Sequence, residues 1–222
     1  MAPISATTIK MSDESQKGGV IGAVHDRFIF SRRTRVLADH LASLIPPGSR
    51  VLDVGCGDGT IDCLIKQKQP DIDIQGIDPL LRPNARIPVR AFDGEHIPYA
   101  NRSFDVVMFV DVLHHTVDPL ILLREAVRVA PTVVIKDHFR EGLFAQSTLR
   151  LMDWVGNARH GVALPYNYWD RKQWTQAFGD LGLRAEREVS PALYPIPFAW
   201  VFGRNLHFVA RLGLRATAAN LA

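Results

Sequence analysis

The feature that most constrains the fold of this chain is a short apolar segment followed by three glycines at alternate positions. Residues 51–54 (Val-Leu-Asp-Val) read as a buried strand, and Gly55, Gly57 and Gly59 follow it. Because glycine adopts positive φ angles at no steric cost, this spacing predicts a sharp turn whose backbone a ligand approaches closely. We therefore expect a strand–turn–helix unit of the kind that binds nucleotides.

The charge of this turn separates two ways of binding a nucleotide. Dinucleotide-binding proteins use a G-x-G-x-x-G pattern, which places a pyrophosphate on a helix N-terminus. Here the pattern is D-x-G-x-G-x-G, and Asp53 and Asp58 lie where a pyrophosphate would sit. Two carboxylates disfavour an anion and favour a cationic ligand, such as an amino-acid ammonium group or a sulfonium.

The rest of the chain predicts an α/β fold. Its 222 residues suffice for one sizeable α/β domain. Strands are predicted at 50–54, 72–77, 89–92, 104–110, 133–136, 184–190 and 205–210, and helices at 26–45, 60–68, 120–129, 141–155 and 170–181. This alternation predicts a doubly wound, mostly parallel seven-stranded sheet, with the last two strands as an antiparallel hairpin. Residues 1–20 are expected to be a disordered tail, and 21–222 a single domain.

Ligands of such sheets bind beyond the carboxyl ends of the strands. This rule places Asp53, Asp78, Asp93 and Asp111 on one rim. Asp78 ends the second predicted strand, where a carboxylate accepts both ribose hydroxyls of a nucleoside. The alternative for Asp78 is a solvated residue of the turn that Pro79 favours.

Three downstream segments carry a family resemblance. They are 92–99 (Phe-Asp-Gly-Glu-His-Ile-Pro-Tyr), 103–107 (Ser-Phe-Asp-Val-Val) and 111–119 (Asp-Val-Leu-His-His-Thr-Val-Asp-Pro). Together with the glycine turn they resemble class I S-adenosylmethionine-dependent methyltransferases. The last segment is similar to the small-molecule, ubiquinone/menaquinone-type branch of that family. The resemblance covers about residues 26–138 and implies S-adenosylmethionine as the cofactor.

The resemblance also implies a set of cofactor contacts. The glycine turn would meet the amino-acid half of the cofactor, Asp78 the ribose, and Asp93 with Gly94 the adenine. The full expected set is Asp53, Gly55, Cys56, Gly57, Asp78, Pro79, Asp93, Gly94, Val110 and Asp111. The basic stretch at 27–33 is expected to be either a solvated helix face or a lid over the cofactor.

Residues 139–222 are expected to determine the methyl acceptor. They mix aromatic side chains with polar ones, as pockets for organic ligands do. The expected substrate contacts are His160, Tyr166, Tyr168 and Trp200, with ordinary core packing as the alternative. The acceptor is expected to be a small, largely apolar metabolite, methylated on oxygen or carbon.

Two histidines are candidates for catalysis. A base is needed only where the acceptor must lose a proton, and His138 and His115 are the candidates, with packing as their alternative. His114, His115, Asp137 and His138 could converge on a metal ion, but they show no recognised ligand spacing, so no metal site is predicted.

Composition excludes several other classes. The net charge is only +3, and no block of Lys and Arg with interleaved aromatics indicates a nucleic-acid partner. No run of 18 apolar residues predicts a membrane span. Cys56 and Cys63 match no zinc or disulfide framework, so a reduced, cytoplasmic protein is expected. The alternatives are an NAD-linked oxidoreductase and a methyltransferase-like binding protein without turnover, and the oligomeric state stays open.

Overall fold

The computed structural model describes residues 31–157 and 164–215, in which strands and helices alternate. The strands are β1 (Arg50–Val54), β2 (Asp73–Asp78), β3 (Val89–Ala91), β4 (Val106–Val110), β5 (Thr132–His138), β6 (Leu183–Val189) and β7 (His207–Leu214). The helices are α2 (Ser31–Ala42), α3 (Thr60–Lys68), α4 (Pro119–Val129), α5 (Ala145–Asn157) and α6 (Arg171–Asp180). Two short helical segments are η2 (Leu113–His115) and η3 (Ala199–Gly203).

All seven strands form one sheet in the order β3-β2-β1-β4-β5-β7-β6. Neighbours among β1 to β5 run parallel, whereas β7 runs antiparallel to both β5 and β6. The predicted mostly parallel sheet with its C-terminal antiparallel pair is therefore confirmed. β7 lies between β5 and β6, so β6 forms that edge of the sheet.

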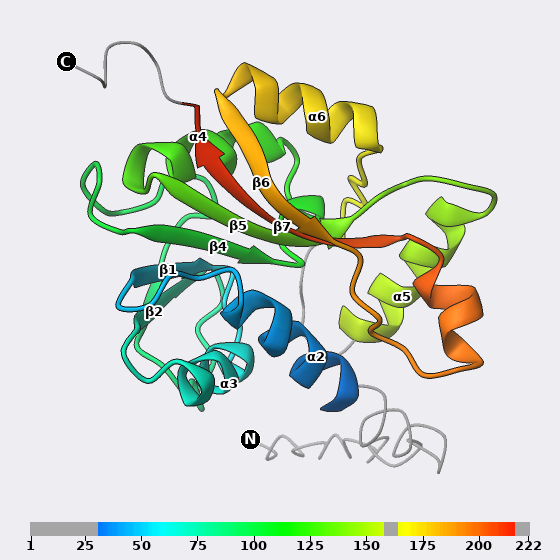
Figure 1. Cartoon of the computed structure of the whole chain (residues 1–222), viewed down its shortest axis with the longest axis horizontal. Coiled ribbons are helices and arrows are strands. Elements are labelled where there is room, and N and C mark those ends of the chain that lie inside the picture. The colour runs from blue at the N-terminus through cyan, green and yellow to red at the C-terminus, as the bar shows by residue number, and fades with distance from the viewer. Residues whose placement is uncertain (1–30, 158–163, 216–222) are drawn as a thin grey trace, which may run out of the picture.

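Helices cover both faces of the sheet, with α4 and α6 on one side and α2 and α3 on the other (Figure 1). Successive side chains of a strand point to opposite faces. Leu52 of β1 accordingly packs in the cluster that contains Leu123 of α4. Val51 packs in the cluster that contains Leu41 of α2. Because both faces are covered, the central strands are apolar almost throughout, as buried parallel strands are.

Several element bounds differ from the predicted ones. β5 extends to His138, two residues past the predicted end, because β7 pairs with it along its whole length, from Thr132 opposite Gly213 to His138 opposite His207. Asp137 and His138 therefore end a strand rather than follow it. The predicted tail at 1–20 and the predicted contact His160 lie outside the described residues.

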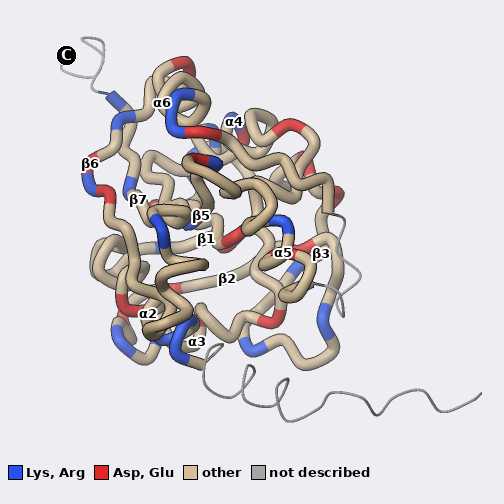
Figure 2. The backbone as a smooth tube through the Cα atoms, turned by 90° about the vertical axis from the view of Figure 1, so that its right-hand side faces the viewer, with Lys and Arg blue, Asp and Glu red and all other residues tan. Residues whose placement is uncertain are grey.

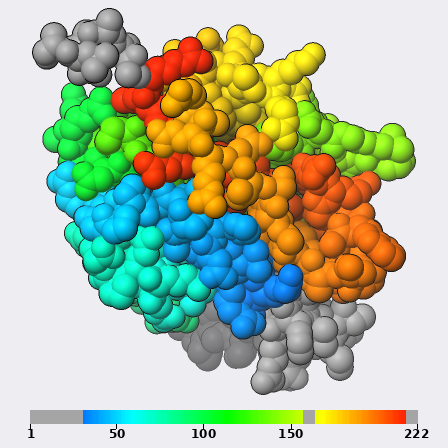
Figure 3. Space-filling model, viewed as in Figure 1, coloured from blue at the N-terminus to red at the C-terminus, as the bar shows by residue number. Residues whose placement is uncertain are grey.

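Segments distant in sequence meet around α2. Figure 3 shows the chain between β6 and η3, in orange, beside α2 in blue. Leu193 of that connection packs in the same buried cluster as Leu37 of α2. Basic and acidic positions are interspersed along the backbone (Figure 2). Among residues 31–157 and 164–215, none of the helices has the length and apolar character that crossing a bilayer requires.

Candidate active site

The glycine turn follows β1 at the carboxyl edge of the sheet. The Gly55 N–H donates to the Ile77 carbonyl at 2.7 Å, so the start of the turn stays attached to β2. Gly55 and Gly57 have φ angles of 78° and 60°, which favour glycine. A Cβ atom on Gly55 would lie 2.6 Å from Val112 Cγ2, whereas one on Gly57 would meet no atom within 4 Å. Gly55 thus permits close packing, and Gly57 borders open space.

Asp78 faces this turn from the end of β2. Its side chain is buried, its Oδ2 accepts from the Gly57 N–H at 2.9 Å, and its Oδ1 accepts from the Leu80 N–H at 2.7 Å. Each carboxylate oxygen can accept a further hydrogen bond. Next to it, a Cβ atom on Gly94 would lie 3.8 Å from Pro79 Cγ, so the segments after β2 and β3 meet. Asp78 is therefore held in place with acceptor capacity to spare.

Asp53 and Asp62 bury two carboxyl groups beneath the turn. They are 2% and 0% exposed, and Asp53 Oδ1 has no hydrogen-bond partner among the described residues. Burial and the neighbouring Asp62 raise the pKa of Asp53 well above its usual value. Burial also raises the pKa of Asp62, to about 6. Cys56, in the turn itself, has a raised thiol pKa because of burial and Asp53, so it stays a neutral thiol.

Asp93 holds its own turn together. Its Oδ1 accepts from the N–H groups of Glu95 at 2.8 Å and His96 at 2.7 Å, and its Oδ2 lies 2.9 Å from His96 Nδ1. These backbone donors, with the His96 ring, lower the pKa of Asp93 to about 2. The sequence did not indicate this capping role. The adenine contact stays a prediction.

Asp111 is enclosed by two cations. It follows Val110 at the end of β4 with a φ angle of 58°, and it forms ion pairs with Arg33 of α2 and Lys136 of β5. Lys136 is fully buried. Burial would raise the pKa of Asp111, but Lys136 and Arg33 hold it below its usual value. Arg33 is thus paired rather than part of a solvated face. The carboxylate of Asp111, a predicted cofactor contact, already forms ion pairs with two side chains of the protein.

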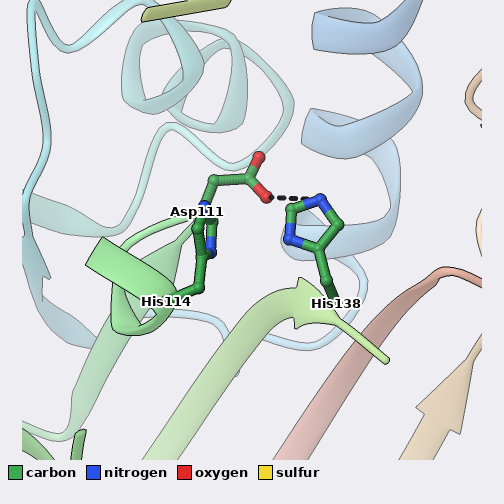
Figure 4. A group of neighbouring side chains, drawn as sticks. All are labelled: Asp111, His114 and His138. Carbon is green, nitrogen blue, oxygen red and sulfur yellow. Dashed lines mark ion pairs between the residues drawn. The ribbon is translucent and has the colours of Figure 1, made fainter. Parts of the chain in front are cut away.

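The two candidate bases, His138 and His115, lie in one cluster with a third histidine, His114. His114 of η2 and His138 of β5 both approach Asp137 Oδ1 through their Nδ1 atoms, at 2.7 Å and 3.2 Å. Their rings lie 4.7 Å apart. Figure 4 shows Asp111 and His138 facing each other, with 3.7 Å between Asp111 Oδ1 and His138 Nε2. The ring of His115 lies 4.2 Å from that of His114.

These histidines differ in charge. Burial alone would lower the pKa of His114, but Asp137 and then Asp153 raise it to about 10. Burial lowers the pKa of His138 well below its usual value, and burial with the nearby His114 lowers that of His115. At neutral pH His114 therefore carries a proton on both nitrogens, and the two candidate bases are neutral.

Asp153 of α5 completes the cluster, although the sequence reading did not name it. Its Oδ1 lies 3.5 Å from Nε2 of His114 and 3.5 Å from Nε2 of His115. One signal was available. Ala145, Leu149 and Asp153 recur every four residues and are all buried, so a carboxylate stands on the apolar stripe of the helix.

Of the predicted substrate contacts within the described residues, Tyr166 and Tyr168 lie near each other, with ring centres 6.4 Å apart. Tyr168 is 3% exposed, and its hydroxyl oxygen lies 2.9 Å from Asp153 Oδ2 and 3.1 Å from the Leu149 carbonyl oxygen. This burial favours the alternative of core packing for Tyr168, whose hydroxyl contacts Asp153. Tyr166 is half-buried, with the Arg150 guanidinium 4.7 Å from its ring centre. Trp200 of η3 is 70% exposed and lies at the surface.

Solved structures of two methyltransferase-related proteins and of a cyclase share this fold. A chain from the complex between the Haloferax volcanii Trm112 methyltransferase activator and a methyltransferase superposes with a TM-score of 0.67 and 19% identity, over 88% of this chain and 95% of that one. An S-adenosylmethionine-dependent methyltransferase from Aquifex aeolicus superposes with a TM-score of 0.56 and 18% identity, over 83% of this chain and 93% of that one. The [4+2]-cyclase SpnF superposes with a TM-score of 0.60 and 16% identity, over 82% of each chain.

Sequence comparison identifies the family. A family model described as a methyltransferase domain matches residues 25–188, so the chain belongs to this methyltransferase family. This membership confirms the methyltransferase resemblance over the NAD-linked alternative. It is 32% identical over 111 residues to 27-O-demethylrifamycin SV methyltransferase of Amycolatopsis mediterranei. That match covers 43% of this chain and 40% of the relative, so the chain matches less than half of the relative's length.

The residues at the glycine turn fit the cofactor that this family uses. Open space borders Gly57 where any side chain would project. The fixed carboxylate of Asp78 retains acceptor capacity for ribose hydroxyls. Asp53 lies buried beneath the turn, and its Oδ1 has no hydrogen-bond partner among the described residues.

Proposed function

We propose that this enzyme methylates an oxygen or carbon atom of a small, largely apolar metabolite, with His138 as the base. The observation that supports this most is the position of His138. Its neutral ring ends β5 at the carboxyl edge of the sheet, the edge that also carries the glycine turn after β1 and Asp78 of β2, with β4 between β5 and β1. Asp137 orients the ring from the side of Nδ1. The relative from Amycolatopsis, by its name, acts on 27-O-demethylrifamycin SV.

The cofactor contacts follow from the same rim. Asp53, Gly55 and Gly57 hold the amino-acid half, Asp78 accepts the ribose hydroxyls, and the segment of Asp93 meets the adenine. When bound, the cofactor supplies a methyl carbon activated by positive sulfur. The remaining task of the protein is to align the acceptor and to take up any proton that it loses.

The histidine cluster defines where that proton goes. With the proton of neutral His138 on Nδ1, facing Asp137, Nε2 presents a lone pair to the acceptor. Proton uptake makes the ring cationic. Asp111 Oδ1, 3.7 Å from Nε2, then stabilises the new charge. His115 is a second candidate for this role, and Tyr166, Trp200 and His160 are candidate walls for an apolar acceptor.

The proposal is tested by replacing His138 with asparagine. The enzyme is incubated with methyl-labelled S-adenosylmethionine and an organic-solvent metabolite extract, and the labelled product is identified by mass spectrometry. We expect wild-type enzyme to label a small apolar compound on oxygen or carbon. His138→Asn should lower kcat by about 10²–10⁴-fold and leave the affinity for S-adenosylhomocysteine unchanged.

The control is His40→Asn on α2, which should behave as wild type. Wild-type turnover by His138→Asn would contradict the role of this residue. Label that enters only protein or nucleic acid would contradict the acceptor class.

A further inference from the structure

Three ligand-type atoms meet between η2 and α5. His114, His115 and Asp153 each offer one such atom, and these atoms lie within 4.8 Å of one another. Asp153 Oδ1 is 3.5 Å from Nε2 of both histidines. A divalent ion about 2.0–2.2 Å from each ligand separates its ligand atoms by about 3–3.5 Å. The spacing therefore approaches that of a shared ion.

The Nε2 atom of His114 faces this space, and its contact with Asp153 Oδ1 at 3.5 Å is an ion pair rather than a hydrogen bond. His114 is 2% exposed, and its Nε2 has no hydrogen-bond partner among the described residues. Its other nitrogen, Nδ1, lies 2.7 Å from Asp137 Oδ1. Metal-binding histidines usually have such a carboxylate at the second ring nitrogen, because it fixes the ring and strengthens the ligand.

The carboxylate ligand is oriented in the same way. The Tyr168 hydroxyl donates to Asp153 Oδ2 at 2.9 Å, which directs Oδ1 toward the two histidines. Both outer contacts of a built metal site are thus present, one on a histidine and one on the carboxylate.

A neighbouring trio is less suited to a cation. Asp111, His114 and His138 also lie within 4.8 Å of one another (Figure 4). Asp111 there already pairs with Lys136 and Arg33. Two positive side chains repel a metal ion.

We infer that His114, His115 and Asp153 form a binding site for one divalent transition-metal ion of the Zn²⁺ type. Two imidazoles and one carboxylate suit such ions and leave a coordination position open for water or an acceptor atom. Because a metal-binding histidine nitrogen is deprotonated, the ion would displace the Nε2 proton of His114 to solvent. The ion would tie α5 to η2, which joins the acceptor-determining part of the chain to the end of β4. This inference assigns His115 to the metal, leaves His138 as the candidate base, and does not depend on methyl transfer.

The test is titration of tag-free, chelator-treated protein with Zn²⁺, followed by calorimetry and by thermal unfolding. We expect one ion per chain and a higher Tm with the metal. His115→Asn and Asp153→Asn each remove a ligand and should weaken Zn²⁺ affinity by about 100-fold or more, whereas Asp137→Asn, an outer contact, should cost about 10–100-fold. The surface controls His40→Asn and Asp180→Asn should bind as wild type.

His138→Asn separates the two trios, because it should retain Zn²⁺ binding. Binding that is lost in His138→Asn but kept in Asp153→Asn would overturn the inference. So would wild-type affinity in both ligand variants. Co²⁺ offers a second readout, since its visible absorption depends on its ligands. A Co²⁺ spectrum that His115→Asn leaves unchanged would also contradict the site, even if Asp153→Asn fails to fold.

Discussion

Asp53 and Asp62 show how single residues set the electrostatics of the cofactor side. Their carboxyl groups lie beneath the glycine turn, out of contact with water. Burial raises both pKa values, because a charged carboxylate loses its hydration there. Near neutral pH, ionisation of these buried carboxyl groups is therefore electrostatically unfavourable in the free enzyme. A bound cationic ligand would reduce that unfavourable free energy.

This burial predicts a pH-dependent stability. The pKa of Asp62 is about 6 in the folded chain against a usual 3.8. Its contribution is fully present below about pH 4 and is lost as pH rises through about 6, because the unfolded chain releases the proton first. Relative to Asp62→Asn, wild type should lose about 1–3 kcal/mol of unfolding free energy between about pH 4 and about pH 7. Urea unfolding of both proteins across this range measures the difference, and parallel pH profiles would contradict the assignment.

Two glycines of the turn should respond differently to alanine. Gly55→Ala places a Cβ atom 2.6 Å from Val112 Cγ2, so it should destabilise the fold by about 1–3 kcal/mol. Gly57→Ala meets no atom within 4 Å and should cost only about 1 kcal/mol, from its positive φ angle. It should nevertheless weaken binding of S-adenosylhomocysteine, because the new methyl group enters the open space. Urea unfolding and calorimetry separate the two effects, and equal stability losses would count against this picture.

At the scale of elements, one carboxylate joins three pieces of the chain. Asp111, after β4, pairs with Arg33 of α2 and with Lys136 of β5. Lys136 is fully buried, so its charge depends on this partner. The ion pairs therefore fix α2 against the carboxyl ends of the central strands.

Breaking this contact should be costly. Asp111→Asn leaves Lys136 buried without a full counter-charge, and we expect a loss of about 3–5 kcal/mol in unfolding free energy. The double variant Asp111→Asn/Lys136→Met removes both charges and should recover part of the loss. Chemical unfolding of the single and double variants measures this. A double variant that is less stable than the single one would contradict the role of Asp111 as the partner of Lys136.

The sequence predicted the elements better than the contacts between them. The apolar run at 133–136 predicted β5, but Lys136 within it gave no sign of full burial, because its partner Asp111 comes from another strand. Asp153 was missed for the same reason, since the histidines that it meets lie in η2. Tyr168 was expected in a pocket, because an aromatic side chain with a hydroxyl suits a pocket wall and a core equally.

At the scale of the whole molecule, the class of sheet could be expected from the motifs, but the position of β7 between β5 and β6 could not. The glycine turn, the strand-end carboxylates and the alternation of strands and helices predicted the parallel sheet, and the two late strands predicted the antiparallel pair. The acceptor region was less predictable. The proposed region involves η2, β5 and α5, whose side chains meet only through the tertiary fold.

The central claim is that S-adenosylmethionine binds across the glycine turn and Asp78, and one calorimetric comparison tests it most directly. S-adenosylhomocysteine is titrated into wild type, Asp78→Ala and the control Asp73→Ala, which alters the exposed start of the same strand. Loss of the charged acceptor in Asp78→Ala should weaken binding by about 1–3 kcal/mol, roughly 5–150-fold, while Asp73→Ala should match wild type. Unchanged affinity in Asp78→Ala, or wild-type protein that binds NAD(H) but not S-adenosylhomocysteine, would contradict the account.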